Sequence, residues 1–365
     1  MCAPEGAEGA EGAATADRGA AAYTGSLPAT MRAVLATKAS ADADFSNLRY
    51  VTDQPVPAPG IGEVVIAVAA SSVNPVDWKI TDPGGVVGLV FKYPHVLGFD
   101  VAGVVAAVGK GCKRLKVGDA VWADLGQVWP LRGGQLGAYA EYALADEKQV
   151  GRSPTSIGHA EAAALPLVAL TSYQALVKAG APWAAQQQRG DLTVMVTSGS
   201  GGTGFVATQM AKHAWNATTV ITVCGTANAA FCAANGADVV HTYDNATGAD
   251  PFALIPADSV DVVYDNFGAP GTADKAMAVL RSGGVYIFLP GKNGGVSKHP
   301  KAGVKQINYG DCDSSKHEDL DAIAAMVDAG FVRSHVQRSF ALADIVNAFN
   351  VSYGGQVVGK LGVTI

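Results

Sequence analysis

Charged residues are scarce in this chain. Only 16% of its 365 residues are charged, and 26 Lys and Arg stand against 32 Asp and Glu, which gives a formal net charge of −6. No cluster of Lys and Arg forms the basic stripe that a nucleic-acid-binding surface requires, so we expect no nucleic-acid partner. Hydrophobic residues make up 49% of the chain, which is enough to bury a sizeable core.

Long hydrophobic runs are missing as well. The longest apolar stretch without a charge is residues 162–177, and Pro166, Thr171 and Gln174 interrupt it. A membrane-spanning helix needs about 20 apolar residues. The stretch therefore predicts a buried helix, and we expect no integral membrane span.

Paired cysteine motifs are absent. The cysteines are scattered, odd in number and never spaced as C-x-x-C. They are Cys2, Cys112, Cys224, Cys232 and Cys312. This usage predicts free thiols in a reducing compartment, either cytoplasmic or organellar.

The first 28 residues repeat Glu, Gly and Ala and show no apolar periodicity. We expect residues 1–28 to form a disordered tail. Acidic side chains outnumber the single Arg18 there, so the segment carries no clear targeting signal. The remaining length suits two domains that share a cleft.

The chain shows two successive patterns of predicted secondary structure. Residues 31–145 consist of short strand-like runs separated by Gly and Pro, which predicts a compact β-rich domain. After Pro154, helical segments alternate with apolar strands, which predicts a doubly wound parallel sheet and an α/β fold. The expected helices are 159–179, 202–214 and 227–235, with another starting near 315. The terminal strand, residues 359–365, can pair with either sheet.

A glycine-rich motif follows the apolar strand expected at 192–197. Gly199, Gly201 and Gly204 fit the pattern G-x-G-x-x-G, and a helix is expected directly after it. Such a turn lets the backbone approach a pyrophosphate, while the helix N-terminus offers free N–H groups. The alternative is a purely structural glycine turn. The predicted phosphate-binding residues are Ser198, Gly199, Ser200, Gly201, Gly202, Thr203 and Gly204.

The strand after this helix bears on which dinucleotide is bound. An NAD site normally offers a carboxylate to the adenosine ribose. Between His213 and Asp238 the chain has no charged residue, so nothing repels a 2′-phosphate, and NADPH is favoured over NADH. No Arg or Lys is present to attract the phosphate either. The predicted contacts are Cys224, Gly225, Thr226, Asn228 and Tyr243.

Several motifs in order now carry a family likeness. They include YPHVLGFDVAGVVAAVG, EAAALPLVALTSYQAL, NGADVVHTYD and VVGKLGVTI. The chain resembles the zinc-independent quinone oxidoreductase and enone reductase branch of the medium-chain dehydrogenase/reductase superfamily, most closely its chloroplast-envelope and reticulon-interacting homologues. The resemblance implies a GroES-like catalytic domain (29–165), a Rossmann domain (166–312) and a segment (313–365) that returns to the catalytic domain. It also implies a homodimer.

The same resemblance argues against a catalytic metal. The zinc enzymes of the superfamily place a Cys where this chain has Asn74, a His where it has Phe99, and their third ligand near Leu167. Amide, phenyl and isobutyl groups do not supply the N/S ligands that zinc prefers. No metal is therefore expected.

The resemblance implies NADPH-dependent reduction of the C=C bond of enones, or of quinones, by hydride transfer. Lys79 and Asn74 are the implied catalytic residues, and Asp77 is expected to be a structural acceptor. Further cofactor contacts are expected from Thr171, Asn266, Phe288, Leu289 and Lys360. The alternatives are an enoyl thioester reductase and a nucleotide-binding protein with little turnover. Substrate choice is expected to depend on the loops 78–93 and 124–136.

Overall fold

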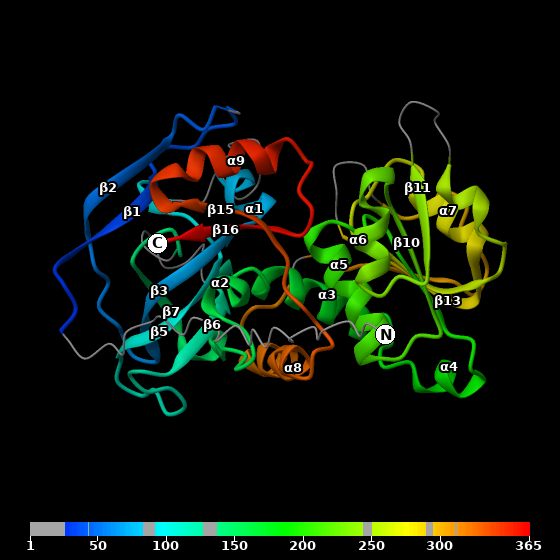
Figure 1. The fold of residues 1–365 in the computed structure, drawn as a ribbon, viewed down its shortest axis with the longest axis horizontal. Helices are drawn as coiled ribbons and strands as arrows, with labels where there is room; N and C mark the ends of the chain where they lie inside the picture. The colour runs from blue at the N-terminus through cyan, green and yellow to red at the C-terminus, as the bar shows by residue number, and fades with distance from the viewer. Residues whose placement is uncertain are drawn as a thin grey trace, which may run out of the picture.

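The computed structural model describes residues 26–42, 44–82, 92–126, 137–243, 250–289, 295–310 and 312–365. Nearly all of the expected tail lies outside these residues, as does most of the two loops expected to shape the substrate pocket. The predicted combination of a β-rich GroES-like domain with a parallel-sheet Rossmann domain is confirmed. The two domains lie side by side, with α3 and α5 near their junction (Figure 1).

The β-rich domain contains two sheets. A seven-stranded sheet has the order β15-β16-β3-β5-β6-β8, with β7 paired to β3, and a three-stranded sheet has the order β2-β1-β4. Its strands from the first half of the chain are β1 (Thr30–Ala36), β2 (Leu48–Pro55), β3 (Glu63–Val73), β4 (His95–Val96), β5 (Asp100–Val108), β6 (Ala120–Asp124), β7 (Tyr142–Asp146) and β8 (Gly151–Arg152). β3 and β5 are rich in Val and Ala, and nearly all of their side chains are buried.

The Rossmann domain is built on six parallel strands in the order β11-β10-β9-β12-β13-β14. They are β9 (Thr193–Val196), β10 (Thr219–Gly225), β11 (Val239–Tyr243), β12 (Val260–Asp265), β13 (Leu280–Phe288) and β14 (Lys305–Asn308). The central strands β9 and β12 are buried on both faces, as their continuous apolar sequences predict.

The longer helices differ in detail from expectation. The predicted helix 159–179 is two helices, α2 (His159–Ala162) and α3 (Pro166–Lys178). Pro166 occupies the first turn of α3, where its missing N–H costs nothing, so the proline starts a helix and does not interrupt one. The predicted helix 202–214 is α5 (Gly202–Gln209) followed by a π-helical turn, η3 (Met210–Ala214).

The other helices are α1 (Pro75–Lys79), α4 (Ala184–Arg189), α6 (Ala229–Ala234), α7 (Thr272–Val279), α8 (His317–Asp328) and α9 (Ile345–Tyr353), with the 3₁₀ turn η4 (Thr226–Asn228) before α6. Within the described ranges, no helix combines the length and the apolar character that crossing a bilayer requires.

The end of the chain returns to the β-rich domain. β15 (Val336–Ala341) pairs in parallel with β16 (Lys360–Thr364), and β16 pairs antiparallel with β3. Figure 1 shows β16, in red, between β15 and β3. The residue before β16, Gly359, also forms a parallel bridge with Gly201 of the Rossmann domain, and its N–H donates to Ser200 C=O at 2.8 Å. The C-terminal segment therefore contacts both domains.

Candidate active site

The glycine motif forms a tight turn between β9 and α5. Ser198 adopts a left-handed conformation, with φ of 49°. Gly199 N–H donates to Val223 C=O at 2.9 Å, and Gly201 N–H donates to Ser198 C=O at 3.0 Å. The turn is thus fixed to the end of β10, and α5 begins at Gly202. The first N–H groups of α5 form an electropositive helix end of the kind that binds phosphate.

Two glycines of this turn leave no room for a side chain. A methyl group at Gly199 would lie 1.7 Å from Thr222 Oγ1, and one at Gly204 would lie 2.1 Å from the Ser198 carbonyl oxygen. At Gly202 a methyl group would lie 3.0 Å from Val168. The first two contacts are impossible without movement of the backbone or of β10. The turn therefore fits a dinucleotide cradle, which needs close approach of the backbone on one side and close packing on the other.

The predicted ribose contacts gather at the carboxyl ends of β10 and β11. Asn228 Nδ2 donates to Ser200 Oγ at 3.1 Å, which joins η4 to the glycine turn. Tyr243 ends β11, is 44% exposed and lies beside Gly225. Thr226 is exposed on η4. Hydroxyl and amide groups are thus present at this edge.

Cys224 is placed differently from the other predicted ribose contacts. Its side chain is 1% exposed and packs in a small cluster with Cys232 and Ala237. Only the backbone of Cys224 lies at the strand end.

Asp100, on β5, is the centre of a buried polar network that the sequence did not predict. Its Oδ2 accepts from Ser72 Oγ at 2.6 Å and Asn74 Nδ2 at 2.7 Å, and pairs with Lys360 Nζ at 3.1 Å. Its Oδ1 accepts from the Leu167 N–H at 2.7 Å. Lys360 Nζ also donates to Asn74 Oδ1. The Lys360 and Asp100 side chains are 3% and 0% exposed, so the pair is desolvated.

Asp77 holds the loop before α1, as expected of a structural acceptor. Its Oδ2 accepts from the Asn74 N–H at 2.7 Å and from Tyr139 OH at 2.8 Å, and its Oδ1 accepts from the Phe99 N–H at 3.1 Å. The side chain is fully buried. Burial, which disfavours the charged form, raises the pKa of Asp77 to about 7, and the nearby Asp100 adds to the effect.

Lys79 ends α1 and is exposed. Its Nζ lies 5.3 Å from the centre of the Trp78 ring, within the range of a cation–π contact. The Trp78 indole N–H donates to Ser352 Oγ at 3.2 Å on α9. Asn74, which precedes α1, is therefore hydrogen-bonded to Lys360. Lys79, at the other end of α1, is exposed to solvent.

Thr171 lies on α3, where the two domains meet. Its hydroxyl donates to Leu167 C=O at 2.7 Å, and the side chain is 6% exposed. The next residue, Ser172, donates to Thr203 C=O at 2.8 Å and so fixes α3 against the glycine turn.

Asn266, Phe288 and Leu289 lie at the carboxyl edge of the sheet, where doubly wound folds bind ligands. Asn266 N–H donates to Thr197 Oγ1 at 3.1 Å. Leu289 N–H donates to Asp265 C=O at 2.9 Å. Phe288 is 2% exposed, so its backbone rather than its ring is available at this edge.

Asp124 is a second buried carboxyl group that sequence reasoning missed. It ends β6 directly opposite Asp100 on β5. Its Oδ2 accepts from Ser314 Oγ at 2.5 Å and from Cys312 Sγ at 3.4 Å, and its Oδ1 accepts from the Gly126 N–H at 2.9 Å. Burial and then the charge of Asp100 raise the pKa of Asp124 to about 6. The only sequence signal was an acidic residue closing an apolar strand.

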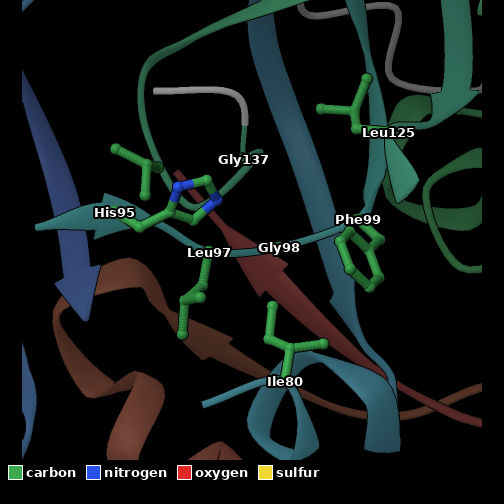
Figure 2. A pocket seen from close by; sticks show the side chains of 8 residues that line it. Ile80, His95, Leu97, Gly98, Phe99, Leu125 and Gly137 are labelled. Atoms are coloured by element: carbon green, nitrogen blue, oxygen red, sulfur yellow. The ribbon is translucent and has the colours of Figure 1, made fainter. Parts of the chain in front are cut away.

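A small cavity adjoins this region (Figure 2). It measures about 10 Å³, which is room for about one water molecule. Ile80, Phe99 and Leu125 make its wall apolar, and His95 contributes an imidazole. Burial lowers the pKa of His95 to about 4, so the ring is neutral at physiological pH.

Two of the positions at which the resemblance places the superfamily's zinc ligands are Asn74 and Phe99. Asn74 is bonded to Lys360 and Asp100, and Phe99 lines the small cavity. Within the described part of the chain, no group of three or more His, Cys, Asp or Glu residues is arranged to hold a metal ion.

Fold and site together define a class of protein. A glycine turn suited to a dinucleotide lies at the carboxyl edge of a parallel sheet, next to a GroES-like domain whose buried polar residues face the junction. This is the architecture of a two-domain, dinucleotide-dependent dehydrogenase or reductase.

Comparison with known families agrees with this class. Residues 60–155 match the family described as alcohol dehydrogenase GroES-like domain, and residues 235–362 match the family described as zinc-binding dehydrogenase. A 2-methylene-furan-3-one reductase from Solanum lycopersicum is 32% identical over 82% of this chain and 71% of its own length. A chloroplast envelope quinone oxidoreductase homolog from Arabidopsis thaliana is 34% identical over 84% of this chain and 91% of its own length. The chain belongs to the medium-chain dehydrogenase/reductase superfamily of oxidoreductases, which confirms the resemblance.

Other similar proteins carry related names. An NADPH-dependent alkenal/one oxidoreductase of Arabidopsis chloroplasts is 34% identical over 63% of this chain and 55% of its own length. The quinone oxidoreductase from Coxiella burnetii superposes with a TM-score of 0.76 at 26% identity, covering 92% of this chain and 99% of that one. A mycobacterial protein solved with NADPH superposes with a TM-score of 0.71 at 28% identity, covering 92% of this chain and all of that one.

Proposed function

We propose that this protein is an NADPH-dependent, zinc-free reductase of the C=C bond of enones, or of quinones. The observation that carries the proposal is the glycine turn, which has no room for a Cβ at Gly199 or Gly204 and which bridges to Gly359 of the returning C-terminal segment. The names of the relatives support the substrate class, because they include an enone reductase, an alkenal/one oxidoreductase and quinone oxidoreductases.

The proposed cofactor site uses the predicted residues. The turn 198–204 would hold the pyrophosphate, and Thr226, Asn228 and Tyr243 would surround the 2′-phosphate. No carboxylate lies between residues 213 and 238 to repel that phosphate. The proposed preference for NADPH therefore rests on the absence of a carboxylate that would repel the 2′-phosphate and on neutral hydrogen-bond donors. Such donors bind phosphate less strongly than Arg does.

NADPH, when bound, supplies the hydride, so the remaining work of the protein is orientation, charge stabilisation and proton supply. We propose Lys79 as the group that stabilises negative charge on the substrate oxygen, because it is a cation at the end of α1. Asn74 is proposed to lie beside the nicotinamide. Its amide is bonded at both ends, to Lys360 and Asp100, so it would contribute a fixed dipole and no proton.

The test measures cofactor binding and turnover in the purified protein. NADPH and NADH are titrated by intrinsic fluorescence, and absorbance at 340 nm is followed after addition of a short-chain enone or a quinone. We expect tighter binding of NADPH than of NADH and acceptor-dependent oxidation. Lys79→Met is expected to lower kcat at least tenfold with the Kd for NADPH unchanged, and Lys79→Arg is expected to retain more activity because it keeps the charge.

Each adverse outcome has a distinct meaning. If neither cofactor binds below millimolar concentration, the glycine turn is only structural. If NADPH binds but no enone or quinone is reduced, acyl thioesters are the next acceptors to assay. Zinc independence is tested by adding a chelator, which is expected to leave kcat unchanged. The homodimer that the resemblance implies is tested by light scattering.

A further inference from the structure

Asp124 connects the two domains. It closes β6 in the seven-stranded sheet, whereas its partners Ser314 and Cys312 follow β14, the edge strand of the Rossmann sheet. Asp124 is 1% exposed and Ser314 is also 1% exposed, so water does not compete for these hydrogen bonds. A hydrogen bond from a hydroxyl group to a carboxylate is one of the stronger contacts available to a neutral donor.

The segment held by Asp124 is also bound to α3. Gln174 Oε1 accepts from the Asp313 N–H at 2.8 Å, and Gln174 Nε2 donates to Asp313 C=O at 2.8 Å. Thr171 precedes Gln174 by three residues, so the two side chains lie on neighbouring parts of one helix face. Cys312 contacts both Thr171 and Asp124. A continuous set of contacts therefore runs from β6 to the face of α3 that carries Thr171.

Among the described residues, the titratable groups that act on Asp124 are Asp100 on β5 and Cys312 after β14. On β5, Asp100 repels it, although Lys360 partly neutralises Asp100. On the segment after β14, the pKa of the Cys312 thiol is raised well above its ordinary value by burial and by Asp124, so the thiol stays protonated and donates. Tyr309 and Tyr264 face Cys312, and burial raises the pKa of both phenols. On α3, Thr171 is uncharged.

We propose that Asp124 is a positioning residue: its ionised carboxylate holds residues 312–314 and, through them, Thr171 in the arrangement that turnover requires. This inference rests on the proposed function, because it takes Thr171 to contact the bound cofactor, as expected from the sequence. Small displacements of the reacting groups change rates strongly, so a contact that fixes one domain against the other controls kcat more than cofactor affinity.

Protonation of Asp124 weakens this contact. The ionised carboxylate accepts from both Ser314 and Cys312, whereas the carboxylic acid must donate its own proton and loses its charge-assisted bonds. Residues 312–314 then lose an anchor on the catalytic domain. The rate is therefore expected to fall as the pH drops through the titration of Asp124.

The test compares four proteins between pH 5 and 8.5: wild type, Asp124→Asn, Ser314→Ala and the control Asp53→Asn, an exposed carboxylate on β2. The first measurement is kcat at saturating NADPH with a short-chain enone or a quinone. We expect a wild-type acidic limb with a midpoint near pH 6. Asp124→Asn should show no limb and a kcat at least fivefold below wild type at pH 8. Ser314→Ala should move the limb to higher pH, because the carboxylate loses a donor.

The second measurement does not depend on turnover. Hydrogen exchange of the amides 312–316 is followed by mass spectrometry over the same pH range, corrected for intrinsic exchange. Wild type is expected to lose protection below about pH 6, and Asp124→Asn is expected to lack protection at every pH. The Kd for NADPH should change less than threefold in Asp124→Asn, and Asp53→Asn should match wild type throughout.

The proposal is overturned if Asp124→Asn keeps the wild-type limb and the wild-type protection of residues 312–316. It is also overturned if Asp124→Asn lowers kcat equally at all pH values while Ser314→Ala leaves the limb in place, since that pattern marks a purely structural role. If wild type reduces neither acceptor, the proposed function fails, and the exchange measurement alone decides whether Asp124 holds the segment.

Discussion

Replacing Lys360 should destabilise the protein more than replacing any exposed lysine. Its Nζ lies 3.1 Å from Asp100 Oδ2, and the two side chains are 3% and 0% exposed. Lys360→Met keeps most of the side-chain stem, which packs near Gly202, and removes the ammonium group with its bonds to Asp100 and Asn74. Asp100 would then be a buried carboxylate without its cation.

The size of the effect follows from what remains around Asp100. Breaking a buried ion pair by removing one partner costs about 3–5 kcal/mol. Three donors still reach the carboxylate, namely Ser72 Oγ, Asn74 Nδ2 and the Leu167 N–H, at 2.6–2.7 Å. These bonds compensate part of the lost charge interaction, so we expect a loss of about 3 kcal/mol.

The assay is urea unfolding followed by fluorescence and by far-UV circular dichroism, whose transitions must coincide before a free energy is extracted. A double-mutant cycle with Asp100→Asn isolates the pair, and we expect the double variant to recover about 2 kcal/mol relative to the sum of the single changes. The control is Lys275→Met, which breaks a pair with Asp250 at 3.1 Å whose side chains are 44% and 38% exposed. It should cost less than about 1 kcal/mol. The reasoning fails if Lys360→Met costs no more than this control, or if the cycle shows no coupling.

Three further results are expected. Gly204→Ala should raise the Kd for NADPH at least tenfold, because its methyl group would lie 2.1 Å from the Ser198 carbonyl oxygen. The control Gly295→Ala, whose methyl group meets open space, should leave this Kd unchanged. Equal Kd values for the two variants would contradict the prediction. Asn228→Ala should weaken NADPH binding about fivefold and NADH binding less, because the side chain also donates to Ser200 of the turn that both cofactors share; equal weakening in the same fluorescence titration would contradict a role at the 2′-phosphate. Burial raises the pKa of Asp77 from 3.8 to about 7, so the stability it contributes is present below about pH 4 and is lost as the pH rises through 7. Relative to Asp77→Asn, wild type should therefore lose up to about 4 kcal/mol of unfolding free energy between pH 4 and 7, measured by urea unfolding at each pH; a constant difference would refute it.

The sequence predicted those features that depend on local spacing. The glycine turn, the alternation of strands and helices, and the absence of charge between residues 213 and 238 are all properties of short segments. Pro166 was harder to interpret, because a proline inside an apolar run can either interrupt a helix or start one. The short edge strand β14 and the helix α7 were missed, since β14 has only four residues, three of them polar, and α7 spans only eight residues.

The polar junction could not be predicted because its members are far apart in the chain. Lys360 and Asn74 are separated by 286 positions, and Ser314 and Asp124 by 190. Such contacts depend on which strands become neighbours and in which register, and hydrophobic pattern alone left the partner of the terminal strand open. The pairing of β16 with β3 is what brings Lys360 to Asp100. The glycine turn of the candidate site can thus be predicted from a short segment of sequence. The polar contacts at the domain junction depend on which strands pair.

The return of the C-terminal strand also sets the charge state of this junction. Among the buried side chains of the described residues, three carboxyl groups gather here, Asp77, Asp100 and Asp124, and Lys360 is their one buried basic partner. Lys360 pairs directly with Asp100 and acts on Asp77 only from a distance, so burial raises the pKa values of Asp77 and Asp124 towards neutrality. Asp100 also reaches across the domain boundary through the Leu167 N–H, whereas Asp124 is the carboxyl group with a raised pKa that bonds to residues after β14, so its titration can alter how the domains are held together.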